Sequence, residues 1–308
     1  MRTQAPFQQL PFDALPAHPR VPHRFGDLPV ERVPVDGPFG RHELAVRRTG
    51  SGPPLLLVHG LMTAGYSWRY VLDGLGEHFT LVIPDLVGSG DSDKPPGRYD
   101  LPALAQSVAA LQRALGLDGV PTVGNSLGGL VCLQRLQQAP DAFERLVVLH
   151  APGATLKRLR LLHAVMRLPG STGLLRRLVA RDPHRWAHRN VHYYDETLKS
   201  REEARVYGDA LVTPGGIEAF ASTLRWALAP TGFRTLRQSL AARPPTCPVQ
   251  LVYATTDPVV PPHVGHTLHA LLPDAELHWL DDASHFAHVD AVPAFLAVAR
   301  PFLLAARS

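Results

Sequence analysis

The sequence has 308 residues, of which 45% are hydrophobic and 19% charged, an ordinary composition for a globular protein with a large core. No apolar run approaches the roughly 18–20 residues needed to cross a bilayer, so we expect no membrane span. The N-terminus lacks the apolar core of a secretory signal, which predicts a cytoplasmic protein. The only cysteines, Cys132 and Cys247, exclude a disulfide framework, and no zinc-binding pattern is present.

The net charge of +4 raises the question of an acidic partner. Many of the positive residues are scattered through one middle segment, without the interleaved aromatic residues of a nucleic-acid-binding module. We therefore interpret them as a solvated helix face and expect no nucleic-acid partner. They include Lys157, Arg158, Arg160, Arg176, Arg177, Arg181 and Arg185.

Residues 1–40 are rich in proline, histidine and polar residues, which predicts an N-terminal arm lying over the main domain. From about residue 41, strand-like and helix-like segments alternate. Fully apolar runs such as residues 55–58 indicate a parallel sheet covered on both faces. The expected strands are 42–48, 55–59, 80–84, 121–124, 145–150, 249–254 and 276–280. The expected helices are 101–115, 126–139, 262–272 and 292–304.

This order predicts an α/β fold with a mostly parallel, doubly wound sheet. The alternation stops between residues 151 and 238, where no convincing strand is found. That stretch contains helix-like segments at 156–168, 172–180, 196–211 and 217–228. They are separated by Pro-Gly and Asp-Pro pairs, which are typical of turns. We predict a core made of residues 41–150 and 239–308, with residues 151–238 inserted as a helical lid.

The pentapeptide Gly124-Asn-Ser126-Leu-Gly128 lies between a predicted buried strand and a predicted helix. This is the pattern of a nucleophile elbow, a sharp turn that exposes a serine hydroxyl at the top of a sheet. A side chain at either glycine would collide with the neighbouring strand or helix. The alternative is an ordinary Gly/Ser turn in which the serine has no catalytic role.

A serine nucleophile needs a base, and the base needs a group that orients it. Asp257 follows the predicted strand 249–254, and His285 follows the last strand, so both fall where parallel sheets assemble active sites. Asp257 precedes a proline and has the alternative role of a turn residue. Among the neighbouring histidines, His278 lies within a strand and His288 within a helix. Asp281 and Asp282 are interpreted as loop residues.

A transition-state oxyanion needs donors, and backbone N–H groups supply them in many hydrolases. The predicted strand 55–59 ends in His59-Gly60, and the glycine allows the chain to turn beneath the nucleophile. The N–H groups of Leu61 and Leu127 are the expected oxyanion hole. His59 is interpreted as a structural histidine.

Together, His59-Gly60, the segment from Asp85 to Ser92, the elbow motif, Asp257 and His285 resemble the α/β-hydrolase superfamily, specifically its lid-bearing branch. The resemblance runs from about residue 40 to the C-terminus. It implies an α/β-hydrolase fold, a lid over the site, a structural role for residues 85–92, and no metal or organic cofactor. The branch includes esterases, epoxide hydrolases, haloalkane dehalogenases and carbon–carbon bond hydrolases.

Departures from these subfamilies narrow the expected chemistry. Epoxide hydrolases and dehalogenases of this branch carry a carboxylate at the elbow, where this chain has Ser126. Lid tyrosines that bind substrate oxygen in epoxide hydrolases resemble Tyr193 and Tyr194, for which packing is the alternative role. The apolar lid suggests an apolar pocket wall. The candidate substrate-binding residues are Met62, Tyr193, Tyr194, Trp226 and Phe286, and the candidate lid wall is Leu161, Leu162, Val165, Met166, Leu174, Leu175, Phe220, Leu224 and Trp226.

The sequence thus predicts a serine hydrolase that cleaves a carboxylic ester or a related apolar acyl compound, with Ser126, Asp257 and His285 as the triad. A carbon–carbon bond hydrolase or a perhydrolase-like enzyme on the same triad is an alternative. A small-molecule receptor built on the hydrolase fold is another.

Overall fold

A computed structural model describes residues 5–153 and 156–305 of the chain. Its centre is an eight-stranded sheet with the order β1-β2-β4-β3-β5-β6-β7-β8. The pairings β1–β2 and β2–β4 are antiparallel, and all other neighbouring strands are parallel. The strands are β1 (Glu31–Gly37), β2 (Gly40–Gly50), β3 (Pro54–Val58), β4 (Thr80–Pro84), β5 (Thr122–Asn125), β6 (Leu146–Leu149), β7 (Val249–Ala254) and β8 (Glu276–Leu280).

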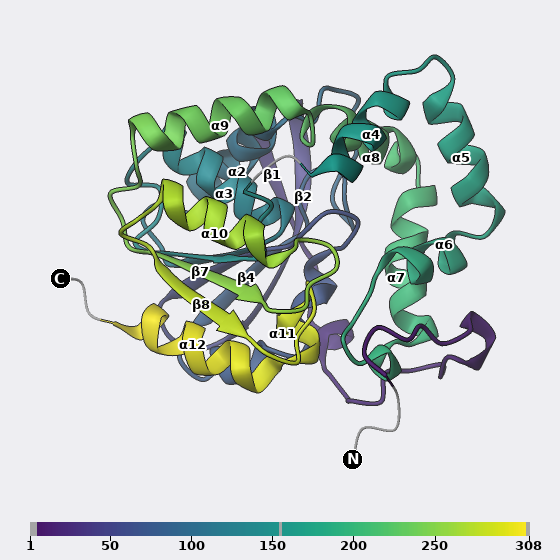
Figure 1. Cartoon of the computed structure of the whole chain (residues 1–308), viewed down its shortest axis with the longest axis horizontal. Helices are drawn as coiled ribbons and strands as arrows, with labels where there is room; N and C mark the ends of the chain where they lie inside the picture. Colours follow the sequence, from purple (N-terminus) through teal and green to yellow (C-terminus); the bar gives the residue numbers. More distant parts are fainter. Residues whose placement is uncertain (1–4, 154–155, 306–308) are drawn as a thin grey trace.

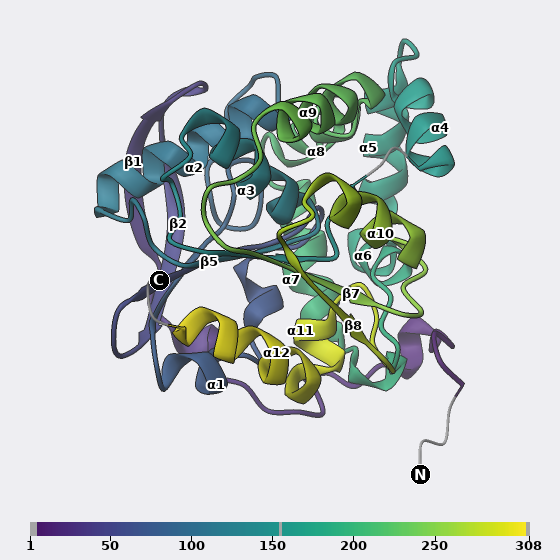
Figure 2. The same ribbon diagram turned by 60° about the vertical axis from the view of Figure 1, so that its left-hand side comes forward.

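Helices cover both faces of the sheet (Figure 2). Alternate strand residues therefore enter two separate cores: Leu56 and Val58 join one, and Leu55 and Leu57 the other. This two-sided burial explains why β3 is apolar at every position. One face carries α2 (Leu101–Leu115), α3 (Leu127–Gln138), α9 (Pro230–Ala242) and α10 (Pro262–Leu271), and the other α1 (Leu72–Gly76), α11 (Ala287–Asp290) and α12 (Val292–Leu304).

The chain leaves the sheet after β6 and returns at β7, and most of the intervening helices project to one side of the sheet (Figure 1). We call residues 157–226 the helical insertion. Among the described residues, no helix has both the length and the apolar character needed to cross a membrane. The insertion consists of α4 (Lys157–Met166), α5 (Ser171–Arg181), α6 (Pro183–Asn190), α7 (Arg201–Val212) and α8 (Gly216–Trp226).

The N-terminal segment differs from the expected arm over the main domain. Its last part is strand β1, which lies at the sheet edge and buries Val33 and Val35. The edge position tolerates Pro34, whose missing N–H would interrupt an inner strand. Its first part contacts the helical insertion: Gln9 Nε2 donates to the carbonyl of His188 at 2.7 Å. Between these two parts, Phe25 is buried in the core. Residues 16 and 17 also accept backbone hydrogen bonds from the start of α7.

Candidate active site

The elbow residue Ser126 joins β5 to α3 with φ 53° and ψ −116°, a conformation that non-glycine residues rarely adopt. The surrounding glycines are required by close approach. A Cβ at Gly128 would lie 2.3 Å from the carbonyl oxygen of Val58, and one at Gly124 would lie 2.8 Å from the carbonyl oxygen of Gly128. The turn is therefore held in a strained conformation that places Ser126 at the carboxyl end of the sheet.

Gly128→Ala is expected to destabilise the fold by about 3 kcal/mol or more, because the new methyl group meets backbone atoms that cannot move independently. Urea denaturation measures this change. Gly173→Ala on α5 is the matched control. Its methyl group meets no atom within 4 Å, and the gain in helix propensity is expected to stabilise the protein by about 0.5–1 kcal/mol. Equal stability of the two variants would contradict the close-packing account of the elbow.

The loop after β3 passes close to Ser126. A Cβ at Gly60 would lie 3.2 Å from Ser126 Cβ and 2.9 Å from Asn125 Oδ1, so glycine is required for this approach. The fully buried His59 fixes the loop through two backbone contacts: its Nε2 accepts from Leu86 N–H, and its Nδ1 lies 2.8 Å from the carbonyl oxygen of Gly60. Burial lowers the pKa of His59, so the ring is neutral.

Asp85 connects the loop that follows β4 to the segment that follows β3. Its carboxylate accepts from the backbone N–H groups of Gly65 and Asp91 at 2.6 and 2.8 Å. These contacts agree with the structural role expected for residues 85–92.

Asp257 and His285 meet at the carboxyl ends of β7 and β8. The Nδ1 atom of His285 lies 2.7 Å from Asp257 Oδ2, and both residues are about 97% buried, at 3% exposure each. Asp257 Oδ1 accepts from the N–H groups of Val259 and Val260. Burial alone would raise the pKa of Asp257, but the His285 interaction and these donors outweigh it and lower the pKa below its ordinary value. The acid is therefore ionised and fixed against the ring.

His150, at the end of β6, occupies the alternative position for a triad acid. Its φ is 51°, and its ring centre lies 5.5 Å from that of His285. Its Nε2 accepts from Ala254 N–H, and burial lowers its pKa to about 3. The His150 ring is therefore neutral, and it adds no charge beside Asp257.

Ser126 and His285 open onto the same cavity of about 290 Å³, which Leu61 and Leu127 also line. Met62 and Phe286, two of the predicted substrate-binding residues, lie on its wall as well. The roof of the cavity belongs to the helical insertion, and it is apolar. Its residues include Leu159, Leu162, Met166, Leu175, Phe220 and Leu224.

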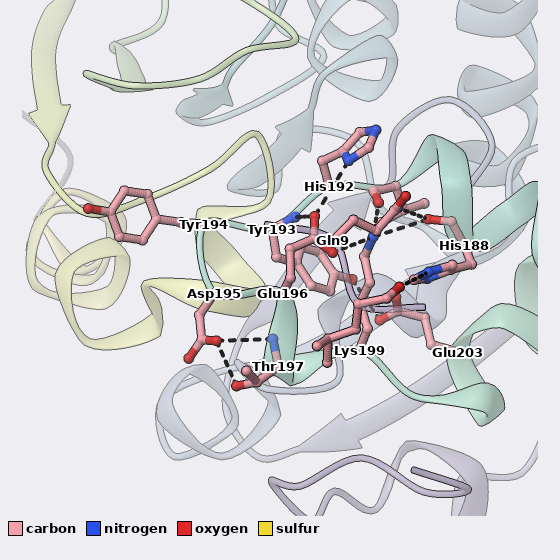
Figure 3. Close-up of polar contacts among 12 residues, drawn as sticks. Gln9, His188, His192, Tyr193, Tyr194, Asp195, Glu196, Thr197, Lys199 and Glu203 are labelled. Carbon is pink, nitrogen blue, oxygen red and sulfur yellow. Dashed lines mark hydrogen bonds and ion pairs between the residues drawn. The ribbon is translucent and has the colours of Figure 1, made fainter. Parts of the chain in front are cut away.

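The other three predicted substrate-binding residues lie elsewhere. Tyr193 is fully buried and donates its hydroxyl to Glu203 at 2.6 Å, whereas Tyr194 points away from that cluster and donates to Asp282 (Figure 3). Trp226 lies beside the turn between α4 and α5, where Arg98 stacks over its ring. These three residues do not line the cavity that Ser126 and His285 share, and the contacts of Tyr193 and Tyr194 agree with the packing role given above as their alternative.

Four predicted lid-wall residues are likewise outside the cavity. Leu161, Val165, Leu174 and Trp226 are exposed to solvent. Helical spacing predicted apolar faces correctly but gave no information on which face points inward. Sequence reasoning also missed lining residues that follow no motif, among them Arg158, Trp186, Asn190 and Val260.

A buried charged network joins the insertion to the core and had no signal in the sequence. Arg69, which follows the 3-10 helix Gly65–Trp68, pairs with Glu203 of α7, and neither side chain is more than 4% exposed. Lys199 pairs with Glu196 at 2.6 Å and also donates to the carbonyl of His188 (Figure 3). Arg69 and Glu203 are 134 positions apart in the sequence.

No group of three histidine, cysteine, aspartate or glutamate side chains with metal-binding geometry occurs within residues 5–153 and 156–305.

Comparison with known proteins supports the fold described above. The family model for the alpha/beta hydrolase fold matches residues 53–292, and this chain belongs to that family. An uncharacterised protein of Mycobacterium tuberculosis is 32% identical over 266 residues, covering 84% of this chain and 77% of that protein. A 2-hydroxy-6-oxo-2,4-heptadienoate hydrolase of Pseudomonas putida is 29% identical over 290 residues, covering 88% and 98%.

Among solved structures, a thermophilic esterase of Thermogutta terrifontis matches with a TM-score of 0.66 and 23% identity. The match covers 89% of this chain and 98% of the esterase. At this level of identity, the likeness bears on the fold alone.

Proposed function

We propose that this protein is a serine hydrolase that cleaves a carboxylic ester or a related apolar acyl compound through an acyl-enzyme on Ser126. The observation that carries the proposal is the 2.7 Å contact between Asp257 and His285, with His285 and the strained elbow serine on one apolar cavity. Asp257 holds His285 Nδ1, which leaves Nε2 as the base for the serine hydroxyl.

In this mechanism Ser126 Oγ attacks the substrate carbonyl carbon, and His285 takes the hydroxyl proton. The N–H groups of Leu61 and Leu127 stabilise the resulting oxyanion. The tetrahedral intermediate then expels the alcohol, which receives the proton from His285. A water molecule, deprotonated by His285, attacks the acyl-enzyme and releases the acid, and the proton returns to Ser126.

The test is reaction of the purified protein with a fluorophosphonate, followed by intact mass and peptide mapping. We expect one adduct on Ser126 that is lost in His285→Ala. Ser107→Ala is the control, since it removes a buried serine of α2 that does not line the cavity, and it is expected to leave labelling unchanged. A folded protein that forms no adduct would contradict an activated serine and favour a receptor that binds without turnover.

A carbon–carbon bond hydrolase on the same triad is the second candidate. It is favoured by the 29% identity to the Pseudomonas putida hydrolase, which spans 98% of that enzyme. Product analysis separates the two candidates. Release of nitrophenol from nitrophenyl esters of increasing acyl length supports the esterase. Cleavage of a vinylogous diketone with no ester turnover supports the carbon–carbon bond hydrolase.

A further inference from the structure

Helices α4 and α5 have two apolar faces, although a surface helix of a globular protein needs only one. The inward face lines the cavity through residues such as Leu162 and Leu175. On the outward face, apolar residues recur at helical spacing along α4 and into the turn that follows it. They are Leu161, Val165 and Leu168, which are 68%, 44% and 59% exposed. Leu174 and Leu178 of α5, one turn apart, are 58% and 57% exposed. We call these five residues the outer leucine face.

Positive charge surrounds the outer leucine face. Residues 157–181 contain seven lysines and arginines and no aspartate or glutamate. Arg176 pairs with Glu218, and Arg158 donates to the carbonyl of Pro258. The other five are exposed and form no ion pair with a carboxylate in the described part of the chain: Lys157, Arg160, Arg167, Arg177 and Arg181.

An exposed tryptophan completes this surface. Trp226, at the end of α8, shares a shallow groove with Leu168 and Arg167 at the turn between α4 and α5, and it is 37% exposed. Figure 1 shows α5 at the outer edge of the helical insertion, away from the sheet. Leucines, a tryptophan and unpaired arginines on one face are the combination found in helices that lie in a membrane interface.

We propose that the outer leucine face docks on an anionic lipid surface, with the leucines and Trp226 entering the headgroup region and the arginines contacting lipid phosphates. Charge complementarity selects this occupant. A second copy of the chain, placed symmetrically, would bring the same unpaired cations against one another without a carboxylate from the segment to neutralise them. Clusters of lysine and arginine of this size on an amphipathic surface are typical of proteins that bind acidic lipids. The docking does not depend on the proposed reaction.

The test is co-sedimentation of the full chain with vesicles of phosphatidylcholine alone and with vesicles that also contain phosphatidylglycerol. We expect binding only to the phosphatidylglycerol vesicles, weakening as salt is added. The triple variant Arg160→Gln, Arg177→Gln, Arg181→Gln is expected to lower the partition coefficient roughly tenfold to hundredfold. The double variant Leu161→Asp, Leu168→Asp is expected to abolish binding even at low salt.

Matched controls carry the same changes elsewhere. Arg41, Arg113 and Arg234 are exposed arginines on other elements, and Leu304 is a leucine of α12 with 47% exposure. The triple variant Arg41→Gln, Arg113→Gln, Arg234→Gln and the single variant Leu304→Asp are both expected to bind vesicles like the unmodified protein. Melting curves verify that each variant is folded.

Three results would overturn the proposal. The first is a protein that stays in the supernatant with both kinds of vesicle at low salt. The second is binding that the leucine variant leaves unchanged, which would indicate unspecific attraction by net charge. The third is a dimer in sedimentation velocity that Leu161→Asp, Leu168→Asp dissociates, which would make a second copy the occupant.

Discussion

Replacing Ser126 with alanine is expected to lower kcat for ester cleavage by roughly 10⁴-fold or more, because without the hydroxyl no acyl-enzyme forms. Steady-state kinetics with a nitrophenyl ester measures the loss. A variant that keeps the turnover of the unmodified protein would contradict the assignment of the nucleophile.

The backbone at Ser126 provides a sharper control. Alanine keeps the unfavourable φ of 53°, whereas glycine adopts it without strain. Ser126→Gly is therefore expected to be as inactive as Ser126→Ala but more stable, by about 1–3 kcal/mol. If both variants are inactive but Ser126→Gly is the more stable, the fold holds the backbone of residue 126 in a strained conformation. Equal stability would show that the turn is relaxed with any residue.

Glu203→Gln is expected to destabilise the protein by about 3–5 kcal/mol, because it leaves the Arg69 guanidinium buried without a counter-charge. The same carboxylate accepts from the Tyr193 hydroxyl, so two contacts weaken together. Arg69 also stacks over the rings of Tyr66 and Tyr70, which holds it in place. Urea denaturation measures the change.

Glu218→Gln is the matched control, since Glu218 pairs with Arg176 at the surface, where both side chains are about half exposed. Its loss is expected to cost at most about 1 kcal/mol. The double variant Arg69→Met, Glu203→Leu is expected to recover much of the stability lost in Glu203→Gln, because no uncompensated charge remains buried. A change below 1 kcal/mol for Glu203→Gln would show that Arg69 is solvated or paired in another way.

Much of the sheet could be predicted from the sequence because its strands are buried on both faces and therefore apolar. The expected segments 80–84, 249–254 and 276–280 coincide with β4, β7 and β8. Strand β1 was missed because Pro34 interrupts its alternating pattern within a proline-rich segment. Helix α6 was missed because Asp182-Pro183 has the appearance of a turn. In the structure Asp182 caps the helix through Arg185 N–H, and Pro183 occupies its first position.

The acid–histidine contact could be anticipated because loops after parallel strands converge at one edge of the sheet. The residues that form the roof of the cavity could not be predicted from the sequence. An amphipathic pattern defines an apolar stripe, and α4 has two such stripes, of which Leu162 is on one and Leu161 on the other. The choice between them depends on where α8 and the core lie, which is tertiary information. The pairing of Arg69 with Glu203 depends on the same information.

The hydrogen bond between Gln9 and His188 has a consequence for synthesis of the chain, because its partners are 179 positions apart. At typical translation rates of about 5–20 residues per second, Gln9 is synthesised roughly 10–35 seconds before His188. Strand β1, by contrast, meets β2 across a turn of two residues. Gln9 and residues 16 and 17 can therefore form these contacts only after α6 and α7 have emerged, late in translation.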